Sequence, residues 1–136
     1  MANIRVDLES VQVIEGQGAG EGDFEVRIQV AEGSHVLIWP SLNGSTRVDN
    51  GGAAQSINRP VATYAVTSGT LTKKFTIDVT EVDKGTLGQD DQGQSTLTFD
   101  LTPTMAPSTK SATISLKRPN MSYQGKAKVT LTAQRV

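Results

Sequence analysis

Apolar and polar residues alternate along most of the chain with a period of two, which is typical of half-buried β-strands. The clearest example lies at residues 75–101, FTIDVTEVDKGTLGQDDQGQSTLTFDL. The apolar residues of this stretch are Phe75, Ile77 and Val79 before an acidic segment, and Leu97, Phe99 and Leu101 after it. The pattern therefore predicts two strands joined by an acidic loop.

The same alternation predicts strands elsewhere, and no helical periodicity competes with it. The predicted strands cover residues 4–13, 24–30, 36–39, 61–67, 71–81, 97–102, 112–116 and 127–133. The apolar phase shifts between Leu8 and Val11, which predicts a bulge near Glu9 and Ser10. Residues 41–58 contain turn signals, and we interpret them as a long loop, leaving open a short hairpin around 46–48.

Eight short strands with polar turns predict an all-β fold, an antiparallel β-sandwich, as one domain over residues 1–136. A chain of this length can bury a core without a disulfide, and it contains no Cys. In such a sandwich, the loops that follow odd-numbered strands emerge at one common end. The loops after the first, third and fifth predicted strands are therefore expected to lie together.

The net charge of −1 hides a strong segregation of acids and bases. Twelve of the 14 acidic residues lie within residues 7–25 and 78–100, and none follows Asp100. The last third carries the basic residues Lys110, Lys117, Arg118, Lys126, Lys128 and Arg135. We expect this basic segment to lie away from the acidic loops, on a different surface.

Carboxylates gather in the two acidic loops and repel one another unless a positive group lies among them. The candidate ligands are Glu15, Glu21 and Asp23 in the first loop, and Glu81, Asp83, Asp90 and Asp91 in the later one. The loop with Asp49 and Asn50 is expected to join them. Calcium takes six to eight oxygen ligands, so three such loops suit a calcium ion. A basic neighbour in place of the ion is the alternative.

Two segments resemble the C2 domain family. GDFEVRI at 22–28 is similar to the start of a C2 strand, and IDVTEVD at 77–83 followed by DDQG at 90–93 is similar to the family's acidic third-loop segment. The resemblance implies an eight-stranded sandwich of the permuted topology with calcium between three loops. It makes Asp23 a first-loop ligand, Glu81 and Asp83 the third-loop pair, and Asp90 or Asp91 the late ligand. Gln17 stands where the family's first aspartate falls, so Glu15 or Glu21 would substitute for it.

Other functional classes fit the composition less well. A single histidine, His35, and the lack of Cys exclude His- or Cys-rich zinc sites and Ser-His or Cys-His catalytic pairs. Few aromatic residues disfavour carbohydrate binding, unless Trp39, Tyr64 and Tyr123 line one exposed face. No segment resembles a signal peptide or a membrane span, and the localisation stays open.

The sequence thus predicts a non-enzymatic, calcium-binding, C2-like interaction module. A metal-free structural subunit of a larger assembly, such as a coat, tail or secretion apparatus, is the alternative. We expect a protein partner or a second copy of the chain, and neither nucleic acid nor a small-molecule substrate. Membrane insertion is not expected, because Leu87 is the one large apolar residue at the tips of the acidic loops.

Overall fold

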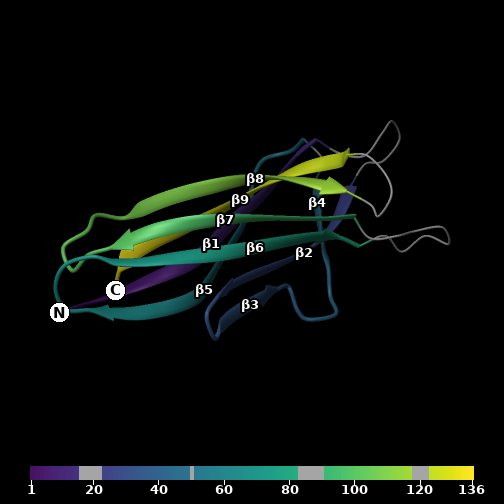
Figure 1. Ribbon diagram of the computed structural model, residues 1–136. Coiled ribbons are helices and arrows are strands. Elements are labelled where there is room, and N and C mark those ends of the chain that lie inside the picture. Colours follow the sequence, from purple (N-terminus) through teal and green to yellow (C-terminus); the bar gives the residue numbers. More distant parts are fainter. Residues whose placement is uncertain (16–22, 50, 83–90, 118–122) are drawn as a thin grey trace.

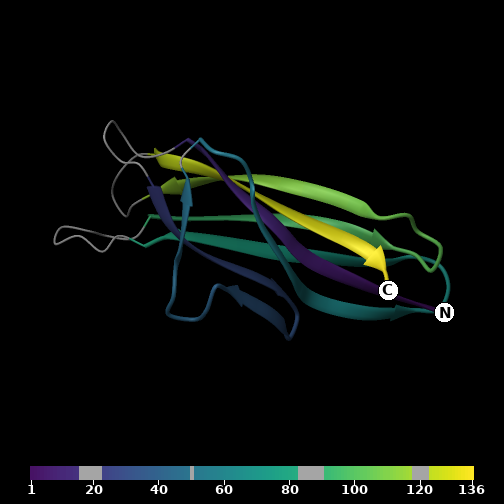
Figure 2. The same ribbon diagram turned by 180° about the vertical axis from the view of Figure 1, so that it is seen from behind.

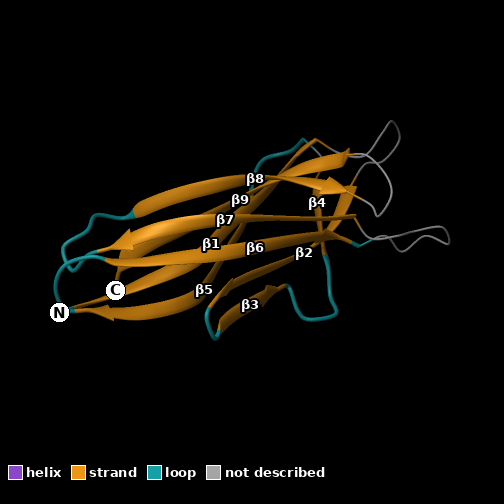
Figure 3. Cartoon of the chain, in the orientation of Figure 1, coloured by secondary structure: helices purple, strands orange, loops and turns teal. Residues whose placement is uncertain are grey.

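The alternating sequence forms strands throughout the part of the chain that the structure, a computed structural model, describes: residues 1–15, 23–49, 51–82, 91–117 and 123–136 (Figure 1). Only strands and their connections occur in these ranges (Figure 3). The strands are β1 (Ala2–Glu15), β2 (Asp23–Glu32), β3 (His35–Trp39), β4 (Thr46–Asp49), β5 (Gln55–Val66), β6 (Leu71–Glu81), β7 (Asp91–Leu101), β8 (Ser108–Lys117) and β9 (Tyr123–Arg135).

The strands form two antiparallel sheets joined at one corner. The pairing order is β3-β2-β6-β7-β8-β9-β1-β5, with β4 also paired to β2. β3 and β4 pair with successive parts of the same edge of β2, so together they take the place of one strand. The first sheet is β3/β4-β2-β6-β7 and the second is β8-β9-β1-β5. Figure 2, seen from behind, brings β1, β5 and β9 of the second sheet to the front. The predicted antiparallel β-sandwich is confirmed, but the described ranges hold nine strands and not eight, because β4 forms within the predicted loop.

Several predicted boundaries are wrong; β8 and β9, for example, begin at Ser108 and Tyr123, four residues before their predicted starts. Residues 41–58 do not form one long loop, because β4 covers Thr46–Asp49 and β5 starts at Gln55. β4 forms because Val48, 1% exposed, anchors it to the core. β7 begins at Asp91 and not at Leu97, because its polar first half pairs residue by residue with β6. The predicted bulge is confirmed by register shifts between Leu8 and Ser10 in both pairings of β1.

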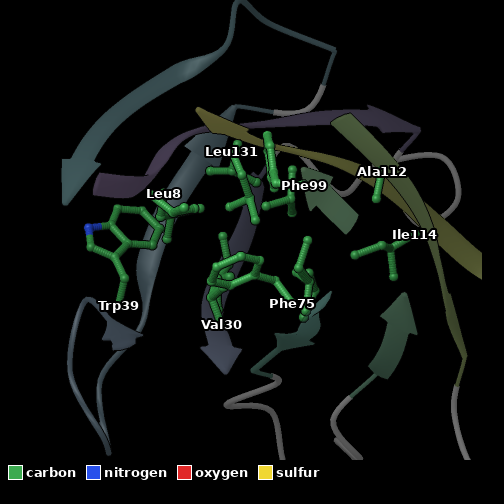
Figure 4. Packing of buried hydrophobic residues seen from close by; sticks show 14 of the residues in the cluster. Leu8, Val30, Trp39, Phe75, Phe99, Ala112, Ile114 and Leu131 are labelled. Carbon is green, nitrogen blue, oxygen red and sulfur yellow. The ribbon is translucent and has the colours of Figure 1, made fainter. Parts of the chain in front are cut away.

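The core lies between the inward faces of the two sheets, where the predicted apolar positions meet. Phe75 and Phe99 are almost fully buried, and their rings meet edge to face with centroids 6.1 Å apart. Figure 4 shows these rings among Leu8 and Leu131 of the second sheet. Burial of large side chains such as these stabilises the fold by roughly 1.5–3 kcal/mol each.

Gly93 makes the corner between the sheets possible. β7 and β8 share one ladder pair, Gln92 with Lys117. A Cβ added to Gly93 would lie 2.3 Å from the backbone oxygen of Ser115 and 2.6 Å from Cγ2 of Ile114. Because a backbone oxygen cannot move aside cheaply, only glycine lets β7 lie this close to β8.

Tyr64 closes the opposite side of the sandwich, where β3 and β5 are the free edges. Its hydroxyl donates a hydrogen bond to Glu32 at the end of β2, and Lys73 Nζ lies 5.1 Å from its ring centroid and 3.7 Å from the Glu32 carboxylate. The His35 ring meets Tyr64 edge to face at 5.6 Å. Burial, followed by the hydrogen bond to Glu32, raises the pKa of Tyr64 well above its ordinary value.

The free edge of the second sheet, β5, is irregular. Its register with β1 shifts twice, between Val6 and Asp7 and between Leu8 and Ser10. Pro60 lies within it, and Asn58 has a positive φ of 52°. Pro60 has no N–H to donate, so it suits an edge position.

We predict that Gly93→Ala lowers the free energy of unfolding by about 1–3 kcal/mol or more, because the added methyl overlaps the β8 backbone. Urea unfolding followed by circular dichroism measures the effect. Thr96→Ala, at an exposed position of the same strand, is the control and should change stability by about 0.5 kcal/mol or less. Equal stability of the two variants would contradict the close contact.

We predict that Tyr64→Phe lowers stability at neutral pH by about 1–2 kcal/mol, because it removes the hydroxyl that donates a hydrogen bond to the part-buried Glu32 carboxylate. A raised pKa keeps Tyr64 protonated in the folded state while the unfolded chain ionises near pH ~10. The wild-type protein therefore loses this stability as pH rises above that value, and the variant does not. The free energy of unfolding, measured for both proteins from neutral to alkaline pH, should differ less as pH rises. A difference that stays constant would contradict the stabilising role of the Tyr64 hydroxyl.

Candidate functional site

Acidic residues gather at the end of the sandwich opposite the two termini (Figure 1). We call this end the acidic pole and define it by the strand-terminal residues Glu15, Asp23, Asp49, Glu81 and Asp91. Asp23 pairs with Asp49 across β2 and β4, and Glu81 pairs with Asp91 across β6 and β7. Glu81 is also the register partner of Val26 on β2. The strand pairing thus links both acidic pairs within one sheet.

Glu81 and Asp91 are two buried carboxylates that stand directly opposite each other. They are 6% and 0% exposed, and each continues the inward phase of its strand, after Val79 in β6 and before Phe99 in β7. Directly opposed residues have Cβ atoms about 4.5–5.5 Å apart. Both residues also interact with other groups of the protein. Burying two like charges this close is costly unless a cation, a proton or strong donors compensate them.

Glu25 fixes the end of β6 against β2, a role that the sequence did not indicate. The N–H of Val82 donates a 2.7 Å hydrogen bond to the Glu25 carbonyl. The Ser45 hydroxyl donates to the Glu25 carboxylate at 3.1 Å and ties in the segment before β4. These contacts hold the residue after Glu81 in place. A backbone hydrogen bond and a side-chain hydrogen bond between such distant residues leave no periodic signal in a sequence.

The expectation that the basic residues lie away from the acidic pole is wrong for two lysines. Lys126 is the register partner of Glu15 in β1. Lys117, at the end of β8, pairs with Gln92, the residue after Asp91. The reason is the order β7-β8-β9-β1, which places the ends of β8 and β9 beside those of the acidic strands. The pole therefore carries both signs of charge.

The structure places some of the predicted ligands and leaves others outside the described residues. Glu81 and Asp91 come together, while the backbones of Glu15 and Asp23 are placed on β1 and β2. Glu21, Asp83 and Asp90 lie outside the described residues, as does Asn50. Within the described ranges, no group of three or more His, Cys, Asp or Glu side chains is arranged to hold a metal ion.

The exposed aromatic face that would suit a carbohydrate does not form from Trp39 and Tyr64. Trp39 is 7% exposed and Tyr64 is 9% exposed, and both belong to the core. His35 contacts the Tyr64 ring.

In the ranges that the structure covers, no helix is long and apolar enough to cross a membrane.

Comparisons with solved structures found 11 matching chains. No protein-family model matches the sequence, and no curated protein matches it. The C2A domain of plant extended synaptotagmin 1 matches over 99% of this chain and 95% of its own, with 13% identity and a TM-score of 0.43. That domain belongs to the family that the two acidic segments resemble. The strand pairing of this chain itself establishes its fold.

Proposed function

We propose that this protein is a non-enzymatic interaction module whose acidic pole binds a calcium ion at Glu81 and Asp91. The observation that carries the proposal is the direct opposition of these two buried carboxylates at the end of the core. Their strands are paired along their whole length, so the spacing of the carboxylates is set by the register and not by a free loop.

The donor chemistry of the pair fits calcium. Carboxylate oxygens are hard ligands, and two directly opposed carboxylates can contact one cation at the 2.3–2.6 Å distances that calcium prefers. Calcium needs six to eight oxygen atoms, so the pair would supply only part of the set. Further carboxylates that the sequence places next to these strands, Asp83 and Asp90, are candidates for the remainder. A bound cation would compensate the two buried charges and connect the ends of β6 and β7.

The interaction partner that we propose is a protein, either another molecule or a second copy of this chain. Enzymatic activity is not proposed, because His35 is the chain's one histidine and contacts Tyr64 in the far half of the sandwich. Membrane insertion is not proposed, because the sequences of the acidic loops offer Leu87 as their one large apolar residue.

A metal-free structural subunit is the second candidate, and the lysines at the pole favour it. Lys117 and Lys126 lie on strands that flank the acidic ones. Cationic side chains of the chain itself could compensate the carboxylates without an ion. In this case the pole is a rigid structural end of the sandwich, suited to a fixed contact within an assembly.

We predict that calcium raises the melting temperature. A ligand that binds only the folded state stabilises it by about 2.7 kcal/mol at 100 times its Kd, which shifts the melting temperature by several degrees for a domain of this size. Differential scanning calorimetry in millimolar calcium, with chelator and with magnesium as controls, measures the shift. An unchanged melting curve would favour the metal-free subunit.

We predict that Asp91→Asn abolishes this calcium-dependent shift, because it removes one of the two opposed charges. Asp100→Asn, on the same strand near its other end, is the matched control and should keep the full shift. Asp100 accepts a hydrogen bond from Thr72 at the exposed surface. If Asp91→Asn lowers the melting temperature equally with and without calcium, the carboxylate is structural and the calcium proposal fails.

A further inference from the structure

A hollow lies on the outer face of the first sheet, at the place where its edge strand is interrupted. β4 pairs with β2 as far as Val26, and β3 pairs with β2 from Ile28, so Arg27 has no ladder partner on that edge. The chain between β3 and β4 bulges outward beside it and carries Leu42, which is 67% exposed. We call this hollow the outer groove. Its main lining residues are Arg27, Ile38, Leu42, Asp78, Thr80 and Gln92.

The outer groove is lined by residues of four strands, β2, β3, β6 and β7. The part beside Arg27 has a volume of about 290 Å³. A second hollow of about 270 Å³ shares Asp78, Thr80 and Gln92 with it and continues to Gln94. These residues belong to β6 and β7, so the groove crosses the sheet from its interrupted edge towards the corner at Gly93. Its length suits an extended chain better than a compact ligand.

The two charged residues of the groove, Asp78 and Arg27, differ in whether another side chain binds them. Asp78 accepts a 2.8 Å hydrogen bond from the side chain of Gln94. Arg27 is half-buried, and in the described ranges no ion pair or hydrogen bond joins its guanidinium to another side chain. The Glu25 carboxylate, two residues before Arg27, already accepts a hydrogen bond from the Ser45 hydroxyl. A guanidinium presents a planar fork of donors that matches a carboxylate, so Arg27 is the position that favours an anionic group.

The remaining lining indicates a peptide. Ile38 and Leu42 offer an aliphatic wall, which suits an apolar side chain, while the carboxamides of Gln92 and Gln94 can both donate to and accept from a peptide backbone. Among the residues that the structure describes, no aromatic side chain lines the groove, so a sugar ring has no stacking surface there. Side chains two residues apart in an extended peptide point to the same side and can reach the wall and Arg27 together.

We propose that the outer groove binds an extended segment of a protein partner that carries an acidic side chain for Arg27 and an apolar side chain for Ile38 and Leu42. This site lies on the outer face of the first sheet and involves neither Glu81 nor Asp91. The proposed peptide contacts are made by outward-facing side chains and need no calcium ion, although Thr80 and Gln92 adjoin Glu81 and Asp91 in the ladder.

The test uses a capped tripeptide with leucine at the first position and glutamate at the third, titrated into the isotopically labelled full-length protein. We expect saturable shifts in the NMR signals of the Thr80 and Gln92 backbone amides, and weaker binding as salt rises. Charge-assisted hydrogen bonds predict that Arg27→Gln weakens binding about tenfold or more, and that Arg27→Lys weakens it less. Lys74→Gln, on the same face of β6 but outside the groove, is the matched control and should bind like the wild type.

Three results would overturn the proposal. The first is the absence of saturable shifts at these amides with a correctly folded protein. The second is equal binding of the tripeptide with glutamine in place of glutamate, or equal binding by Arg27→Gln. The third is saturable binding of maltotriose at the same amides with none of the tripeptide, which would assign the groove to a glycan. If Arg27→Gln fails to fold, the binding of the tripeptide to Arg27→Lys is compared with that of the wild type instead, and equal binding would again overturn the proposal.

Discussion

The close approach of β7 and β8 at Gly93 is the constraint on which the arrangement of the two sheets depends. Each sheet is a separate set of four strand positions, and one ladder pair joins them at this corner. A side chain at position 93 would push the β8 backbone away. On the far side, where no ladder joins β3 to β5, the Tyr64 contacts with Glu32 and His35 connect the sheets instead. The sandwich is thus held by backbone contact on one side and by side chains on the other.

The acidic pole follows from the pairing of β6 with β7. Their ladder runs without a shift from Leu71 and Leu101 to Glu81 and Asp91. The buried phase that begins with Phe75 continues to Glu81, so the strand that fills the core also carries a carboxylate into it. A slip of one residue in either strand would turn its carboxylate outward and expose its phenylalanine. The hydrophobic core therefore determines where these charges lie.

Sequence reasoning predicted the parts of the fold that depend on alternation. The inward phase of Phe75 and Phe99 and the bulge at Glu9 could be read from the pattern. The first half of β7 could not, because its polar residues are held by pairing with β6 and not by their own hydrophobicity. β4 lies where the sequence leaves a short hairpin open, because its one buried apolar residue, Val48, shows no period. The position of Lys126 beside Glu15 and the groove at Arg27 were also missed. Both depend on which strands are neighbours, which the order of residues along the chain does not reveal.

The irregular edge strand β5 has a consequence for how the protein behaves in concentrated solution. A regular edge strand offers a row of N–H and C=O groups to which another chain can add, and this is a common route to aggregation. Pro60 removes one donor from β5, while Asn58 and the two register shifts break the regular spacing of the others. At the other end of the pairing order, β3 is only five residues long and is followed directly by Pro40. β5 and β3 are therefore poor templates for sheet extension, which disfavours fibril formation when copies of this β-rich chain are crowded together.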